Sequence, residues 1–158
     1  MSETINIPVT LSKEEKYFQL LPQIKGLTEN EPDAIANMAN ISAVLKAAFG
    51  FLWVGFYIVR EDELVLGPFQ GNVACTRISY GKGVCGTAWK RQCTLIVPDV
   101  HRFDGHIACD AASASEIVVP LVRNEQVVAI LDIDSEYPAH FDEIDARYLP
   151  EIVDSIGI

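Results

Sequence analysis

The sequence predicts an α+β fold, in which an antiparallel β-sheet carries helices packed on one face and a ligand pocket, roofed by loops, on the other. Three observations lead to this prediction. Helical periodicity is concentrated at the two ends of the chain, the middle is rich in aromatic and β-branched residues separated by short turns, and one long loop interrupts the strands. Successive strands flanked by helices are typical of an α+β domain.

Length, charge and the N-terminus limit the possible functions. A chain of 158 residues fits one domain with one core, so we expect a single domain over residues 1–158, with residues 1–11 as an N-terminal extension. The formal charge of −10 argues against nucleic acid and against anionic membrane surfaces. No secretory signal is visible, and the longest apolar run, 51–59, is too short to cross a bilayer. These features favour a cytoplasmic protein.

Three long helices are predicted at the ends of the chain. The first begins with a capping box at residues 12–15 and continues through Ile24. The second starts near Asp33 and ends at Gly50, with apolar residues at helical spacing between them. The last covers 141–156. We expect these helices to cover the apolar face of the sheet.

The middle of the chain predicts the sheet. Strands are expected over residues 51–59, 64–66, 76–80, 94–97, 115–122 and 126–133. Residues 60–63 and 124–125 read as the turns of two hairpins, and Gly81–Gly86 leads into a short helix through Trp89. Residues 98–113 form a long loop, and such a loop in a compact domain is usually functional or disordered.

Residue parity predicts which side chains share a face of this sheet, because successive side chains of a strand point to opposite faces. In three strands one set of alternate positions is apolar, and the opposite set contains Trp53, Tyr57, Glu116, Asp132 and Asp134. A solvated face is the simplest interpretation. However, two aspartates at i and i+2 repel each other unless a cation bridges them, and aromatic rings are poorly suited to open water. The sequence therefore favours a pocket lined by these five residues beneath the long loop.

The four cysteines fall into two groups. Cys93 precedes an apolar strand, so we expect it to be a buried core residue. Cys75, Cys85 and Cys109 lie beside glycine or polar residues in predicted turns and loops, where a thiol is accessible. In a cytoplasmic chain, reactive or buried free thiols are the expected state.

Two other interpretations of Cys109 have weaker support. Cys109 lies close in sequence to His101 and His106, as zinc ligands do, but the spacing matches no common zinc pattern and no CxxC motif occurs. A cysteine hydrolase with either histidine as the base is supported only by the residue types. We therefore expect no metal and no other cofactor.

Three segments carry a specific resemblance to a known family. They are GPFQGNVACTRISYGKGVCGTAW (67–89), VPDVHRFDGHIACDAASASEIVVPL (97–121) and AILDIDSEYPAHFDEID (129–145). They closely resemble the free methionine-(R)-sulfoxide reductases, single-domain enzymes of the GAF fold, and the resemblance covers nearly the whole chain. A GAF fold alone says little about activity. The specificity comes from three cysteines and the acidic positions coinciding in one sequence.

The resemblance implies roles for the candidate residues. Cys109 matches the catalytic cysteine, Cys75 the resolving cysteine and Cys85 an auxiliary resolving thiol. The substrate pocket of the family falls on Trp53, Tyr57, Glu116, Asp132 and Asp134, which are the residues that parity places on one face. Glu116 is the leading candidate to protonate the sulfoxide oxygen, with Asp134 assisting.

The resemblance also implies the reaction and the partners. It implies that free L-methionine-(R)-sulfoxide is reduced to methionine through a sulfenic acid and an intramolecular disulfide, that thioredoxin regenerates the thiols, and that the protein is a homodimer. Preference for the R epimer comes from the resemblance alone. Two alternatives stay open at this point. One is a non-catalytic GAF sensor of a small ligand, and the other is a redox sensor whose Cys75–Cys109 bond is the output.

Overall fold

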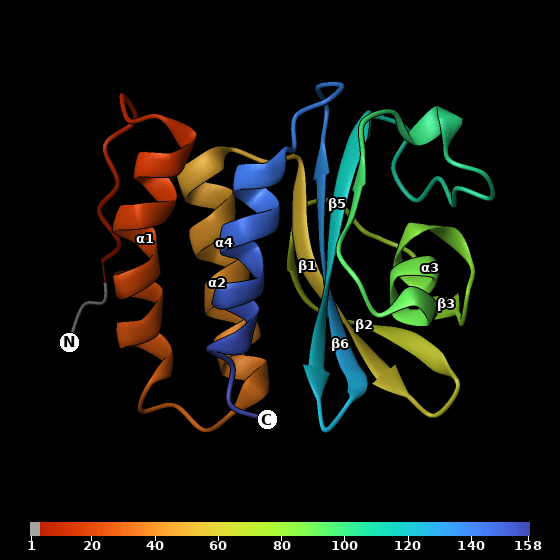
Figure 1. Cartoon of the computed structure of the whole chain (residues 1–158), viewed down its shortest axis with the longest axis horizontal. Coiled ribbons are helices and arrows are strands. Elements are labelled where there is room, and N and C mark those ends of the chain that lie inside the picture. Colours follow the sequence, from red (N-terminus) through yellow and green to blue (C-terminus); the bar gives the residue numbers. More distant parts are fainter. Residues whose placement is uncertain (1–3) are drawn as a thin grey trace.

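Six antiparallel strands form one sheet at the centre of the structure, a computed structural model that describes residues 4–158 (Figure 1). The helices are α1 (Lys13–Thr28), α2 (Ala34–Phe49), α3 (Gly83–Arg91), the short 3-10 helix η1 (Val100–Arg102) and α4 (Glu143–Asp154). The strands are β1 (Trp53–Arg60), β2 (Glu63–Gln70), β3 (Arg77–Ser79), β4 (Leu95–Val97), β5 (Ser115–Arg123) and β6 (Gln126–Ser135). The predicted extension over residues 1–11 is described from Thr4 onward, and its first three residues lie outside the described part.

The strand order β3-β2-β1-β6-β5-β4 places two sequence-distant hairpins side by side. The hairpin β1–β2 and the hairpin β5–β6 meet where β1 pairs with β6. In this register Trp53 lies opposite Asp134, and Asp134 lies opposite Glu116 on its other side. The pairing therefore brings three residues from three strands into one row across the sheet.

The two faces of the sheet are covered differently. Helices α2 and α4 pack on one face, and α1 lies outside them (Figure 1). The side chains that parity assigns to this face, among them Val54, Phe56, Ile117 and Leu131, join the larger hydrophobic core. The predicted fold class is confirmed. In addition, α3 lies on the second face and contacts β5 and β6, which gives that face a smaller hydrophobic core of its own.

Capping side chains fix the ends of the long helices. Ser12 and Glu15 form the predicted capping box of α1, and the Asp33 side chain accepts hydrogen bonds from the first turn of α2. Helix α2 ends at Gly50, whose left-handed backbone (φ 66°) suits glycine. The last helix begins after Asp142 rather than at residue 141, because Asp142 is the extended N-cap of α4.

The larger differences from the sequence prediction lie in β2 and in the long loop. Strand β2 continues to Gln70 instead of ending near residue 66, and its pairing with β1 shifts register between Gly55 and Tyr57. Gly67 and Pro68 obscured this extension in the sequence, since both are rare inside strands. The long loop contains η1, whose N-cap Asp99 accepts a hydrogen bond from His101 N.

No helix within residues 4–158 is long and apolar enough to span a bilayer.

Candidate active site

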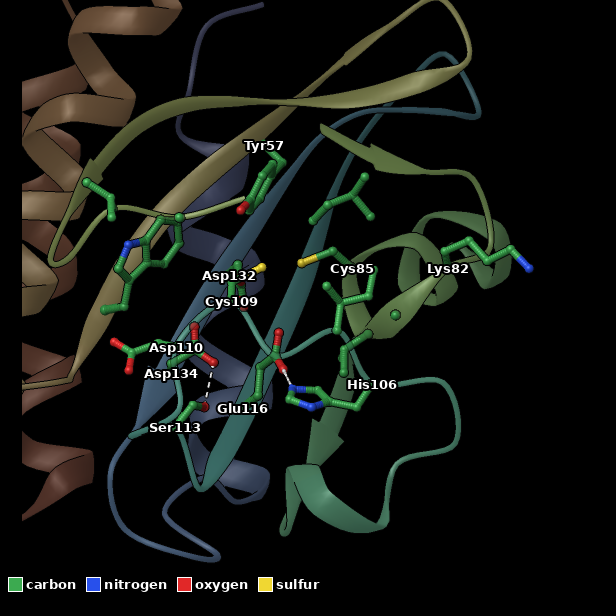
Figure 2. Close-up of a pocket in the computed structure, with 17 residues that line it drawn as sticks. Tyr57, Lys82, Cys85, His106, Cys109, Asp110, Ser113, Glu116, Asp132 and Asp134 are labelled. Carbon is green, nitrogen blue, oxygen red and sulfur yellow. Dashed lines mark hydrogen bonds and ion pairs between the residues drawn. The ribbon is translucent and has the colours of Figure 1, made fainter. Parts of the chain in front are cut away.

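A cavity lies on the α3 face of the sheet, with strands β1, β5 and β6 as its floor (Figure 2). Its walls come from the segment before β3, the first turn of α3 and the loop between η1 and β5. The cavity is lined by all of the predicted site residues except Cys75, namely Trp53, Tyr57, Cys85, Cys109, Glu116, Asp132 and Asp134. Cys75 reaches the cavity through its bond to Cys109. The parity argument therefore identified one contiguous surface.

Three carboxyl groups lie on the floor. Glu116 is 5% exposed and Asp132 is 7% exposed, whereas Asp134 is half-buried. The Ser113 hydroxyl donates a hydrogen bond of 2.9 Å to Asp134 Oδ1. One oxygen of Asp132, Oδ1, is buried and has no hydrogen-bond partner among the described residues. The floor thus presents acceptor oxygens to whatever occupies the cavity.

Burial makes these carboxyl groups weak acids. It is the largest cause of the raised pKa of Glu116, and the charges of Asp132 and Asp134 raise that pKa further. Burial also raises the pKa of Asp134, to which the charge of Asp132 adds. The pKa of Asp132 is raised by burial, against the opposing effect of hydrogen bonds with Glu116 and Cys85. Such groups favour the protonated form and can supply a proton.

Two aromatic side chains of β1 form one wall. Trp53 and Tyr57 are both buried, with ring centroids 6.1 Å apart. Gly55 lies between them, and a Cβ at this position would come within 2.4 Å of the Trp53 ring. The glycine therefore lets the indole lie flat across the strand. Because Trp53 and Tyr57 are buried, the alternative that these positions lie on a solvent-exposed face is excluded.

A disulfide joins Cys75 and Cys109 at the edge of the cavity, with their Cα atoms 5.6 Å apart. Cys75 lies between β2 and β3, and Cys109 lies on the exposed part of the long loop. The two residues are 34 positions apart in sequence, and folding of the loop over the sheet brings them together. This is the pair that the sequence resemblance implied.

The environments predicted for the other two cysteines were wrong. Cys85 is buried in the first turn of α3 rather than accessible in a loop, because that turn packs against the sheet. Its burial, and then the charges of Asp132 and Glu116, raise the pKa of the thiol. Cys93 is exposed rather than part of the core, because it lies in the turn between α3 and β4, before the apolar strand begins at Leu95.

One side-chain group in residues 4–158 has the composition of a cation site. Cys85, Glu116 and Asp132 present ligand atoms that lie within 4.8 Å of one another. The histidines near Cys109 do not form such a group with it in this part of the chain, and Cys109 is bonded to Cys75. A cation bound there would lower the pKa of these carboxyl groups, so the acid floor can ionise and neutralise a positive charge in the cavity.

Several cavity residues escaped the sequence prediction. His106 Nε2 lies 3.9 Å from Glu116 Oε2, and burial, followed by the charge of His101, lowers the pKa of His106. Ser113 reaches Asp134 because Ala114 N donates to Ser135 O, which holds the end of the long loop against β6. No periodicity marks residues within an irregular loop, so only the folded structure shows which of them turn inward.

The first turn of α3 forms the last part of the wall. Lys82, Gly83, Val84 and Cys85 line the cavity, and the N-cap Lys82 makes no side-chain capping bond. The first backbone N–H groups of a helix have no partner within the helix, and they favour anions. The cavity therefore combines an acidic floor with a backbone surface suited to a carboxylate.

Comparisons with known proteins decide the family. The GAF domain family profile matches residues 29–158. The free methionine-R-sulfoxide reductase of Escherichia coli is 47% identical over 144 residues, covering 90% of this chain and 87% of the relative. The structure of the free methionine-R-sulfoxide reductase from Neisseria meningitidis, in complex with its substrate, is 48% identical, has a TM-score of 0.95 and covers 99% of this chain and 94% of the other. This chain belongs to the free methionine-R-sulfoxide reductase family.

The residues matched by the family profile include all the residues that line the cavity. GAF domain-containing protein A of Dictyostelium discoideum is 58% identical over 143 residues, covering 90% of each chain. The GAF match begins directly after α1 and includes every strand, α3 and the long loop. Every cavity residue described above thus lies within the residues that the GAF profile matches, and α1 lies outside them.

Proposed function

We propose that this protein reduces free methionine-R-sulfoxide to methionine, with Cys109 as the nucleophile and Cys75 as the resolving thiol. The observation that carries the proposal is the Cys75–Cys109 pair at the edge of a cavity with three carboxyl groups on its floor. The activity named for the relatives agrees with this arrangement.

The first step transfers one oxygen atom. The Cys109 thiolate attacks the electrophilic sulfur of the sulfoxide, and the sulfur–oxygen bond of the substrate breaks. The attack forms a bond between the Cys109 sulfur and the substrate sulfur. This bond then breaks as the oxygen becomes bonded to the Cys109 sulfur, so that Cys109 becomes a sulfenic acid and methionine leaves with its thioether restored. Two electrons pass from the thiol to the substrate. The sulfoxide oxygen leaves more readily when it is protonated, so the step requires an acid.

Glu116 is the proposed acid. Its burial and the neighbouring aspartates raise its pKa, so it can hold a proton near neutral pH and direct it to the sulfoxide oxygen. Asp134 has a raised pKa as well and can assist.

The remaining groups of the cavity suit a free amino acid. Asp132, with Asp134 beside it, is placed to bind the α-ammonium of the substrate, whose charge lowers the pKa of Asp132 and lets it ionise. The ammonium also gives the unpartnered oxygen of Asp132 a hydrogen-bond partner. The N–H groups of the first turn of α3 suit the α-carboxylate. Trp53 and Tyr57 offer an apolar wall to the S-methyl group. A methionine sulfoxide residue within a protein lacks the ammonium charge and should therefore be a poor substrate.

Regeneration completes the proposal. Cys109 is exposed, so an external dithiol such as thioredoxin can reach the disulfide. Cys85 lines the same cavity as Cys109 and is proposed as an auxiliary resolving thiol. Thioredoxin as reductant and a homodimeric state rest on the sequence resemblance, whereas a cytoplasmic location rests on the composition of the sequence.

Methionine formation from free methionine-R-sulfoxide tests the proposal. With thioredoxin and its reductase present, the wild-type protein and the control Cys93→Ser should release methionine over many turnovers. Cys109→Ser should release none, even in the first turnover. Cys75→Ser should release about one methionine per chain without a dithiol and leave a trappable sulfenic acid on Cys109. First-turnover release by Cys109→Ser would assign the nucleophile elsewhere, and no release by the wild type would favour a sensor.

A further inference from the structure

The segment that carries Cys75 is held in place by two side chains of the cavity wall. Residues 71–76 connect β2 to β3 without regular secondary structure. The indole Nε1 of Trp53 donates a hydrogen bond of 3.0 Å to the carbonyl of Asn72. The hydroxyl of Tyr57 donates a hydrogen bond of 2.9 Å to the carbonyl of Cys75 itself. Both donors project from the same face of β1, so one rigid strand fixes the backbone of the segment at two points.

The Tyr57 hydroxyl is a permanent donor in this position. A backbone carbonyl only accepts hydrogen bonds, so the phenol must provide the proton. Tyr57 is 2% exposed, and burial, followed by the charge of Asp132, raises the pKa of its hydroxyl. The phenol therefore stays protonated across the physiological range. Its ring packs in the smaller hydrophobic core with Trp53, which limits the movement of the hydroxyl.

We infer that Tyr57 is a positioning residue for the resolving step, in which its hydrogen bond to the Cys75 carbonyl holds the Cys75 thiol within reach of Cys109. This inference rests on the proposed function. In the resolving step the Cys75 sulfur attacks the sulfenic sulfur of Cys109. The sulfur–sulfur bond forms, the sulfur–oxygen bond breaks, and the hydroxyl leaves as water with the thiol proton.

Holding the segment matters because the intermediate is exposed. Cys109 lies on the surface, where a second oxidant molecule can convert its sulfenic acid irreversibly to a sulfinic acid. Fast closure of the disulfide protects it. An intramolecular reaction is fast only when the reacting groups are held close together, and the Cα separation of 5.6 Å is normal for a disulfide. A segment released from β1 would spend less time in that arrangement.

The substitution Tyr57→Phe separates positioning from packing, because it keeps the ring and removes only the hydroxyl. Tyr80→Phe is the matched control, since Tyr80 is half exposed and packs edge-on against Trp89. Reduced proteins, all carrying Cys93→Ser because the exposed Cys93 thiol would also consume oxidant, are treated with one equivalent of hydrogen peroxide, which oxidises the exposed Cys109 to its sulfenic acid without any substrate. Disulfide formation is followed by acid quenching, thiol alkylation and mass spectrometry. Dimedone trapping measures the sulfenic acid in parallel.

We expect Tyr57→Phe to slow disulfide formation about tenfold, as the loss of one buried hydrogen bond allows, and to raise the trapped sulfenic acid on Cys109. Tyr80→Phe should match the wild type. A wild-type rate of disulfide formation in folded Tyr57→Phe overturns the inference. If Tyr57→Phe does not fold, Tyr57→Met removes the hydroxyl with a flexible apolar side chain in place of the ring, and a wild-type rate in that folded variant overturns the inference equally. Because peroxide replaces the substrate, this result is independent of methionine formation, which tests the proposed function separately.

Discussion

Glu116 occupies an environment in which a carboxyl group keeps its proton. It is almost completely buried, it lies opposite Asp134 in the sheet, and its closest basic neighbour is the half-buried ring of His106. Both burial and the acidic neighbours raise the pKa of Glu116. A general acid needs this property near neutral pH.

Replacing Glu116 by glutamine should therefore reduce the first-turnover rate of methionine formation by about 100-fold or more, because the amide cannot transfer a proton. Glu125→Gln is the control, since Glu125 is exposed in the turn between β5 and β6. First-turnover methionine release under rapid quench is the appropriate measurement, because it is independent of the reductant. Activity of Glu116→Gln close to that of Glu125→Gln would assign the proton to another group.

At the scale of single residues, alternation along strands was sufficient to predict the acid and aromatic side chains of the cavity. Trp53, Tyr57 and Asp132 could be placed on one face because strand geometry is local and regular. The burial of Cys85 and the exposure of Cys93 could not be predicted. Both depend on where α3 begins, ends and packs, and these are tertiary properties.

Helix α1 is joined to α4 by one buried carboxylate. Asp145 is fully buried and accepts hydrogen bonds from the Tyr17 hydroxyl at 2.6 Å and from Lys13 Nζ at 2.7 Å. It also accepts a hydrogen bond of 2.9 Å from the backbone N–H of Asp142, which completes the capping box of α4. One side chain thus satisfies groups from two helices that are distant in sequence.

Asp145→Ala should lower the free energy of unfolding by about 3 kcal/mol, because it leaves the Tyr17 hydroxyl and the Lys13 ammonium without their buried acceptor. Urea unfolding of the disulfide-bonded chain measures this loss. Asp154→Ala is the control, since its side chain is 68% exposed and pairs with Arg123 at 3.4 Å, and it should cost less than about 1 kcal/mol. Equal losses in the two variants would contradict a special role for Asp145.

At the scale of elements, capping signals and periodicity were sufficient to predict all three long helices, because both act within a few residues. The way the long loop folds over the sheet was not predictable. Its contacts, such as Ser113 with Asp134 and Ala114 with Ser135, join residues that are about 20 positions apart in sequence. No local pattern encodes such contacts.

The whole molecule should lose stability as the pH rises, because its cavity holds several carboxyl groups with a raised pKa. The folded state then binds more protons than the unfolded state, so the stabilisation is complete below the ordinary carboxyl pKa of about 4 and declines as the pH rises through the folded values. His106 and His140 act in the opposite direction, since the pKa of each is lowered. Their contribution ends near pH 6.5, their ordinary pKa.

Above pH 6.5 the free energy of unfolding of the wild type should fall as the pH rises, whereas Asp134→Asn should show a smaller decline. Asp154→Asn serves as the control and should keep the wild-type slope. Urea unfolding at four pH values on the oxidised chain measures both slopes. Parallel slopes for wild type and Asp134→Asn would show that the pKa of Asp134 is not raised in the folded protein.

The position of Cys93 has a practical consequence. In the oxidised chain Cys75 and Cys109 form the disulfide and Cys85 is buried. Cys93 is exposed in the turn after α3. A maleimide dye added to this form would attach at a single site, outside the residues that line the cavity. The labelled molecule could then report binding and docking by fluorescence without mutagenesis.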